Sequence, residues 1–222
     1  MFVRLEQRQR RQFPWATLLL MVACVAYFVG LNLADPAVRV RLISRWGVVP
    51  AMLFDGLDNP LRILSLVTAQ FIHANWLHLL GNLLFLAIFG FPAERVLGWR
   101  RFLLLFLVGG ALANFVGALT IADSRSVIVG CSGAVSAVVG VYLGLFPRAR
   151  LGVVLPLGVY FEFVRVPALL LIGIWALLQL VFTWVGPSFG AVVWWTHIAG
   201  FLFGLVYAAV SRPTLARRQR AG

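Results

Sequence analysis

The chain has 222 residues, of which 62% are hydrophobic and only 12% are charged, whereas an ordinary soluble domain is about 25% charged. No water-soluble fold of this length could bury so much apolar surface, so a soluble globular protein is excluded. The formal net charge is +12, and all 19 basic residues are arginines, most of which flank long apolar runs. This charge indicates membrane topology and not a nucleic-acid-binding patch. The sequence predicts an integral membrane protein that contacts the lipid bilayer and has no nucleic-acid partner.

Six apolar segments lie between the charges, and each approaches or reaches the ~20 residues that a bilayer-spanning helix requires. They are residues 13–33, 77–91, 102–121, 130–146, 166–185 and 192–210. We expect an all-α integral membrane protein in which residues 13–211 form a six-helix transmembrane bundle between two basic tails, 1–12 and 212–222. Region 34–76 is too polar to span a membrane and too apolar for a free linker, so it is predicted to be a long interfacial first loop.

The start of the chain also allows a cleaved leader, because a basic N-terminus before an apolar run describes a signal peptide as well. Met21-Val22-Ala23-Cys24 loosely resembles a lipoprotein cleavage site. The apolar run continues to Leu33, well beyond that cysteine, so we favour a retained first helix over a removed one.

The arginines of the loops predict the orientation. With an even number of spans, the two tails share one side with the loops at 94–101 and 147–165. That side carries 14 arginines against three glutamates, a net charge of +11, and the other side carries five arginines against four aspartates, a net charge of +1. The positive-inside rule therefore predicts that both termini are cytoplasmic.

Polar side chains inside spanning helices are costly, so the few present are candidate functional residues. They are His78, Asn82, Asn114, Ser132, Ser136, Gln179, Thr196 and His197. Ser136 and Gln179 are interpreted as interhelical hydrogen-bond donors. No Asp or Glu lies deep in a span, which argues against a proton-coupled transporter.

Metal chemistry is not expected from the sequence. There is no His-Glu-x-x-His motif. His73 and His78 are five residues apart, a spacing that does not put two side chains on the same face of a helix. Cys24 and Cys131 lie in or beside apolar segments and give neither a disulfide framework nor a metal cluster. We therefore predict no metal and no cofactor.

Four of the polar residues fall at one depth in the membrane. Counted at ~1.5 Å per residue from the arginine that ends each helix, Ser132, His197, Asn82 and His78 lie ~24, ~22, ~20 and ~26 Å from the cytoplasmic surface. In a hydrocarbon core ~30 Å thick, this layer lies several ångströms below the outer surface. Such a layer requires a water-filled cavity that opens to the outer side.

Ser132 lies where a helix begins within the membrane. Gly130 and Gly133 flank it with the glycines of a loop, which leaves 133–146 for the helix. The free N–H groups and positive dipole end of that helix could stabilise an oxyanion beside the serine. His197 is the candidate base at the same depth.

Two rows of small residues allow the helices of Ser132 and His197 to approach closely. They are Ser132, Ser136, Gly140 and Gly144 on one helix, and Gly200, Gly204 and Ala208 on the other. Cys131 is intrinsically the better nucleophile, but neighbouring side chains diverge. The small-residue row puts Ser132, and not Cys131, on the face toward His197.

At these positions the sequence resembles the rhomboid family of intramembrane serine proteases. The family signature is Gly-x-Ser-Gly at the start of helix four, a His before small residues on helix six, and His-x-x-x-Asn on helix two. These read Gly130-Cys131-Ser132-Gly133, His197-Ile198-Ala199-Gly200 and His78-Leu79-Leu80-Gly81-Asn82. The resemblance extends to Phe71-Ile72-His73 and to Glu94-Arg95-Val96-Leu97-Gly98.

The resemblance implies that Ser132 is the nucleophile and His197 the base of a catalytic dyad with no acidic third member. It implies an oxyanion hole formed by Asn82, His78 and the backbone N–H of Ser132. Gly130, Gly133 and Gly200 are the small residues that position the dyad. The first loop would lie sideways in the outer leaflet.

Some positions depart from the family pattern. Ser136 stands where many members have an aromatic residue one turn after the nucleophile. Trp194, Trp195 and Thr196 precede His197 where small residues are usual. The Trp-Arg pair common in the first loop has no clean counterpart.

The expected function is that of an intramembrane serine endopeptidase that cleaves transmembrane segments of membrane-protein substrates. The resemblance implies a bacterial cytoplasmic (inner) membrane, with the active site open to the outer side. The alternative is a catalytically inactive relative that binds transmembrane clients. A channel or transporter is less well supported, because the helices of Ser132 and His197 are almost wholly apolar below these residues. The physiological substrate and the oligomeric state stay open.

Overall fold

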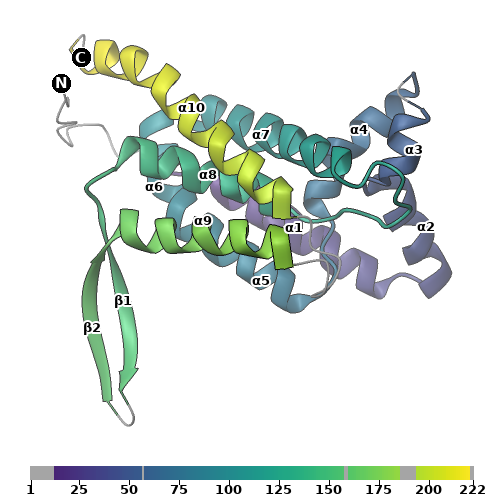
Figure 1. The fold of residues 1–222 in the computed structure, drawn as a ribbon, viewed down its shortest axis with the longest axis horizontal. Helices are drawn as coiled ribbons and strands as arrows, with labels where there is room; N and C mark the ends of the chain where they lie inside the picture. Colours follow the sequence, from purple (N-terminus) through teal and green to yellow (C-terminus); the bar gives the residue numbers. More distant parts are fainter. Residues whose placement is uncertain (1–12, 57, 158–159, 186–193, 221–222) are drawn as a thin grey trace.

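The computed structural model describes residues 13–56, 58–157, 160–185 and 194–220. Over these ranges the chain is a bundle of helices with one β-hairpin extending from it (Figure 1). The predicted N-terminal tail 1–12, the last two residues and the start of the sixth predicted segment lie outside the described residues.

Apolar helices coincide in position with the six predicted segments. They are α1 (Trp15–Leu33); the continuous run of α5 (Trp76–Phe85), η2 (Leu86–Gly90) and α6 (Phe91–Leu97); α7 (Trp99–Leu119); α8 (Ser132–Leu145); α9 (Ala168–Val185); and α10 (Trp194–Arg220). Within the described ranges, four helical runs are long and apolar enough to cross a membrane: 15–33, 76–97, 99–119 and 194–214. The apolar helices at 132–145 and 168–182 are shorter. The all-α integral membrane fold is confirmed, and crossing of the bilayer by all six segments stays a prediction.

The first loop is itself helical. Its three α-helices all begin at a proline, whose fixed φ suits the first helical position. Two of these helices have side-chain caps, because Asp35 and Asn59 accept hydrogen bonds from the backbone N–H groups of Ala37 and Leu61 at 2.8 and 3.0 Å. The elements are α2 (Pro36–Trp46), α3 (Pro50–Phe54), α4 (Pro60–Thr68) and the 3₁₀ turn η1 (Ala69–Phe71).

The connection between α8 and α9 is a β-hairpin. The search for apolar spanning segments predicts only a loop at residues 147–165. Strands β1 (Arg150–Leu157) and β2 (Tyr160–Pro167) pair antiparallel, in a register that runs from Arg150 opposite Pro167 to Leu157 opposite Tyr160. The segment is rich in valine, phenylalanine and tyrosine, which favour strands. Figure 1 shows the hairpin extending well beyond the helices.

The predicted loop around residues 94–101 is also largely helical. Glu94 lies in α6 with 3% of its surface exposed. Its carboxylate accepts hydrogen bonds from the backbone N–H groups of Ala16 and Thr17 at 3.0 and 2.7 Å, and from the Thr17 hydroxyl at 2.6 Å. These donors belong to the first turn of α1, so the carboxylate caps that helix and complements its dipole. Gly98, at φ +79°, joins α6 to α7.

Candidate active site

Ser132 is the first residue of α8, and the loop before it depends on Gly130. This glycine has φ +114°, in the left-handed region. A Cβ at this position would lie 2.5 Å from Cε1 and 2.6 Å from Nε2 of His78. Gly130 is therefore needed both for its backbone conformation and for the close approach of the His78 imidazole. The backbone N–H of Gly130 donates to the carbonyl of Ala69 at 2.9 Å.

The structure brings Ser132 and His197 together. Nε2 of His197 lies 2.9 Å from Oγ of Ser132, although the two residues belong to α8 and α10. The hydroxyl can donate to this nitrogen only if Nε2 carries no proton. The other ring nitrogen of His197 decides whether that condition holds.

Gln179 on α9 keeps Nε2 of His197 unprotonated. Its amide oxygen Oε1 lies 2.7 Å from Nδ1 of His197. An amide oxygen can only accept, so Nδ1 carries the proton and Nε2 is free to accept from Ser132. The predicted interhelical hydrogen bond of Gln179 therefore exists, but Gln179 is the acceptor and not the donor. The three groups form a chain from Ser132 through His197 to Gln179.

Aromatic packing on His197 comes from its own helix. The Trp194 ring meets the imidazole edge to face at a centroid distance of 5.8 Å, and Phe182 stacks on Trp194 at 4.8 Å. Ser136 is buried, and its hydroxyl donates to the carbonyl of Ser132 at 2.7 Å within α8. The prediction of an interhelical bond from Ser136 is wrong, because the carbonyl four residues earlier is a nearer acceptor.

The two residues expected at the oxyanion hole lie one turn apart on α5. One amide N–H of Asn82 donates to the carbonyl of His78 at 2.9 Å, which leaves its second N–H for another acceptor. The backbone N–H of His78 donates to the side chain of Asn75, which caps the start of α5. The imidazole of His78 lies against Gly130. His78 on α5 is thus in contact with the loop that precedes Ser132.

Close contact between α8 and α10 is confirmed at the two rows of small residues. A Cβ on Gly200 would overlap the carbonyl oxygen of Gly133, and one on Gly204 would overlap that of Ala137. A Cβ on Gly140 would overlap the carbonyl oxygen of Phe201. No residue with a side chain fits at these contacts without moving the helices apart, and this spacing keeps His197 within reach of Ser132.

Thr196 lies at the same contact. Its methyl group would be 2.8 Å from a Cβ at Gly133. Its buried hydroxyl has no hydrogen-bond partner among the described residues. Thr196 therefore fills the space beside the start of α8 and does not join the chain of polar groups around His197.

The first loop holds the serine loop from the other side. Val48 and Ile128 form an antiparallel bridge, and the backbone N–H of Ala51 donates to the carbonyl of Ser124 at 3.0 Å. The amide of Asn114 on α7 donates to the carbonyl of Leu66 in α4 at 2.9 Å. Asn114 therefore positions the first loop and does not contact the Ser132–His197 pair.

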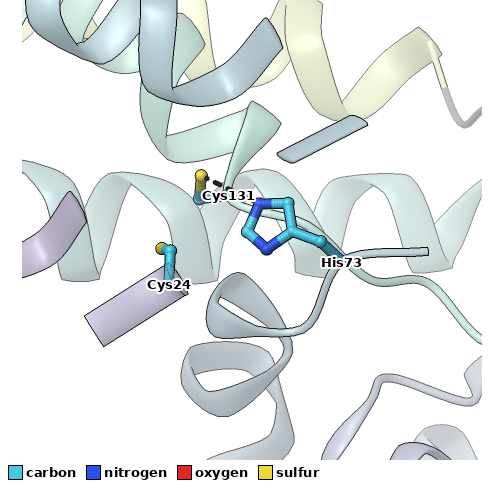
Figure 2. A group of neighbouring side chains, drawn as sticks. All are labelled: Cys24, His73 and Cys131. Atoms are coloured by element: carbon cyan, nitrogen blue, oxygen red, sulfur yellow. Dashed lines mark hydrogen bonds between the residues drawn. The ribbon is translucent and has the colours of Figure 1, made fainter. Parts of the chain in front are cut away.

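A second group of reactive side chains lies next to this site (Figure 2). Cys24, His73 and Cys131 are all buried, and their ligand atoms lie within 4.8 Å of one another. Burial, with a smaller contribution from the charge of His78, lowers the pKa of His73 to about 4, so its imidazole is neutral near neutral pH. The sequence predicts no metal cluster, and spacing alone could not find one because the three residues come from distant parts of the chain.

Taken together, these features define an integral membrane protein of the helical class that carries a serine–histidine pair within its bundle. The chain belongs to the rhomboid family. The family model described as "Rhomboid domain" matches residues 60–214, which include Ser132, His197 and α5.

Named relatives come from bacteria and from plant and animal organelles. The chain is 33% identical to "Putative rhomboid protease YdcA" of Bacillus subtilis over 145 residues, which cover 64% of this chain and 69% of the relative. It is 44% identical to "Rhomboid-like protein 11, chloroplastic" of Arabidopsis thaliana over 107 residues, or 48% of this chain and 35% of the relative. It is 29% identical to "Rhomboid protease GlpG" of an Enterobacter species over 45% of this chain and 33% of the relative. The matched part thus spans only about a third of the last two relatives.

Proposed function

We propose that this protein is an intramembrane serine endopeptidase that cleaves transmembrane segments of other membrane proteins. The observation that carries the proposal is the chain of hydrogen-bonding distances from Ser132 to His197 and from His197 to Gln179, at 2.9 and 2.7 Å. Relatives named as rhomboid proteases support the same activity.

The proposed acylation step uses His197 as a base and then as an acid. Oγ of Ser132 attacks the scissile carbonyl carbon while its proton moves to Nε2 of His197. Collapse of the tetrahedral intermediate breaks the C–N bond, and the proton passes from His197 to the leaving amine. A water molecule then attacks the acyl carbon and gives a proton to His197. The bond between this carbon and Oγ of Ser132 breaks, the new C-terminal carboxyl product leaves, and His197 returns the proton to Oγ.

The developing negative charge on the carbonyl oxygen requires preorganised donors. We assign this role to the backbone N–H of Ser132, the free amide N–H of Asn82 and the imidazole of His78. The N-terminal end of α8 adds the positive end of its dipole. Gly130 allows the close approach of His78, Gly133 allows that of Thr196, and Gly200 keeps α10 close to the start of α8.

The choice of Ser132 over its neighbour has structural support. The thiol of Cys131 is fully buried and lies 3.5 Å from Nε2 of His73, within the group of Figure 2. Its side chain therefore points to His73 and not to His197. Among the described residues, the only base near the thiol is thus His73, and because the sulfur is fully buried beside it, Cys131 is not placed to attack a substrate carbonyl.

The expected substrates are transmembrane helices that unwind near their outer end, because a stable helix hides its carbonyls in hydrogen bonds. The proposed setting is a bacterial cytoplasmic membrane with both termini cytoplasmic and the site open to the outer side. The proposed orientation rests on the net charges of the two sets of loops, +11 and +1, because the more positive set is expected on the cytoplasmic side.

The test is incubation of the purified protein in lipid nanodiscs with a model transmembrane substrate, followed by mass spectrometry of the products. Wild type should cut at a defined bond, Ser132→Ala and His197→Ala should each abolish the cut, and Cys131→Ala should keep most of it. A fluorophosphonate should label wild type but not Ser132→Ala. Cutting by Ser132→Ala would refute the assignment. Folded wild type that binds substrates, cuts none and resists the probe would favour the client-binding alternative.

A further inference from the structure

Cys24, His73 and Cys131 meet from three separate parts of the fold. Cys24 lies in α1, His73 in the segment between η1 and α5, and Cys131 directly before α8. All three side chains are almost fully buried, with exposed fractions of 0%, 1% and 0%. Figure 2 shows the three side chains next to one another, with a dashed line from the sulfur of Cys131 toward the imidazole of His73. We propose that these side chains bind one divalent, thiolate-preferring transition-metal ion, with zinc as the ion that fits best.

The separations suit such an ion. Zn–S bonds of about 2.3 Å and Zn–N bonds of about 2.0 Å at a tetrahedral angle hold sulfur and nitrogen roughly 3.5 Å apart. Sγ of Cys131 and Nε2 of His73 are already 3.5 Å apart. Two sulfurs on the same ion lie roughly 3.8 Å apart, and here all ligand atoms lie within 4.8 Å of one another. Small side-chain movements are sufficient to close the site.

The imidazole of His73 is oriented as a ligand. Its Nδ1 lies 3.3 Å from the carbonyl oxygen of Phe71, which can only accept, so Nδ1 carries the proton. The lone pair of Nε2 therefore faces the sulfur of Cys131. Metal-binding histidines commonly use this arrangement, in which a backbone carbonyl fixes the tautomer of the ring.

The charge balance selects the ion. Binding of Zn²⁺ releases one proton from each thiol, and two thiolates, one neutral imidazole and Zn²⁺ then have a net charge of zero. A neutral complex suits a fully buried position, where an uncompensated charge is costly. Cu⁺ would leave one negative charge. Mg²⁺ and Ca²⁺ prefer oxygen ligands, and this group offers none.

The ion would act as a clamp beside the candidate active site. Cys131 immediately precedes Ser132, and the His73 ring lies 5.3 Å from that of His78. An ion held by these ligands ties α1 and the segment before α5 to the start of α8. Three protein ligands leave one coordination position of a tetrahedral zinc for a further small ligand.

The test measures metal binding and not proteolysis, so it is independent of the proposed protease activity. The full chain in lipid nanodiscs is loaded with Zn²⁺, freed of excess ion by gel filtration, and analysed for metal content by mass spectrometry. Wild type should hold about one zinc per chain. Cys24→Ser and His73→Gln should each lower the affinity at least tenfold. Met21→Leu, which removes a sulfur one turn earlier on α1, should bind as wild type does.

Two further measurements separate lost binding from misfolding. Co²⁺ bound to wild type should show thiolate-to-cobalt charge-transfer absorption, which Cys24→Ser should weaken. Zn²⁺ should raise the Tm of wild type, but not of Cys24→Ser that is folded by circular dichroism. Failure of wild type to retain zinc would overturn the proposal, as would equal retention by folded Cys24→Ser and His73→Gln. A Cys24–Cys131 disulfide in wild type, seen as a loss of two hydrogens by mass, that persists after reduction and zinc loading would also overturn it.

Discussion

The imidazole of His197 lies between a hydroxyl oxygen and an amide oxygen. Gln179 holds the proton on Nδ1, and Ser132 faces the unprotonated Nε2. When Nε2 takes the serine proton, the ring becomes positively charged and its hydrogen bond to Gln179 strengthens. Gln179 is thus a positioning residue, which acts on the proposed reaction through His197 and does not touch the substrate.

Gln179→Met tests this role, because methionine keeps the length of the side chain and removes the acceptor. A hydrogen bond to a charged group contributes about 1.5–3 kcal/mol, which corresponds to a roughly 10- to 150-fold lower kcat. KM should change little, and labelling by a fluorophosphonate should slow in parallel with kcat. Gln179→Glu keeps an acceptor and should retain more activity than Gln179→Met. Equal kcat for wild type and folded Gln179→Met would rule out the positioning role.

The residues at the site differ in how far the sequence could predict them. The juxtaposition of Ser132 and His197 is predicted by two signals together. Both residues lie at the same depth, counted in helical turns from an arginine, and rows of small residues indicate which faces of their helices meet. The partner of Gln179 could not be predicted, since depth does not determine which way a helix turns its faces. The meeting of Cys24, His73 and Cys131 also depends on the packing of distant segments. No local spacing encodes that packing.

At the scale of elements, α8 and α10 pack through backbone contacts, which makes their spacing intolerant of added atoms. The Cβ of an alanine at Gly204 would overlap the carbonyl oxygen of Ala137 and lie 2.8 Å from the backbone N of Val141. Backbone atoms in a helix cannot move aside as a flexible side chain could. The extra methyl group must therefore push α10 away from α8.

Gly204→Ala should lower proteolytic turnover. The substitution lies two turns from His197, and a displacement approaching 1 Å at the reacting groups costs roughly 100-fold in rate. Overpacking should also destabilise the fold by about 1–3 kcal/mol, seen as a lower Tm in detergent. Gly30→Ala is the matched control, because nothing lies within 4 Å of a Cβ there. Equal activity of the two alanine variants would show that the close packing of α8 and α10 does not determine the distance between Ser132 and His197.

Hydrophobic length predicts the apolar helices well and the connections poorly. The boundaries of α1, α7 and α8 lie within three residues of the predicted ones, because composition changes abruptly at a membrane surface. The helices of the first loop begin at Pro36, Pro50 and Pro60, a local signal that a search for spanning segments overlooks. Such a search also overlooks the hairpin between α8 and α9, although the residues of the hairpin favour strands.

At the scale of the whole molecule, the described parts of the two sets of loops lie at opposite ends. Figure 1 shows the hairpin and the C-terminal part of α10 toward one end, and α2, α3 and α4 toward the other. At the first end, Arg212 donates to the carbonyl of Gly144, and Arg101 donates to Thr214. The arginine-rich loops therefore gather at one end of the molecule, as a common membrane surface requires.

Single-cysteine labelling tests the orientation that the charges predict. Ser126 is exposed in the loop before α8, and Gly152 is exposed on β1 with open space around its Cα. In a background of Cys24→Ser and Cys131→Ala, Ser126→Cys should react with an impermeant thiol reagent on intact cells. Gly152→Cys should react only after the membrane is opened, because the positive-inside rule puts the hairpin in the cytoplasm. Ser188 would be a second outer position, but it lies outside the described residues. The opposite pattern of labelling would invert the topology, and the proposed cavity at Ser132 would then open to the cytoplasm.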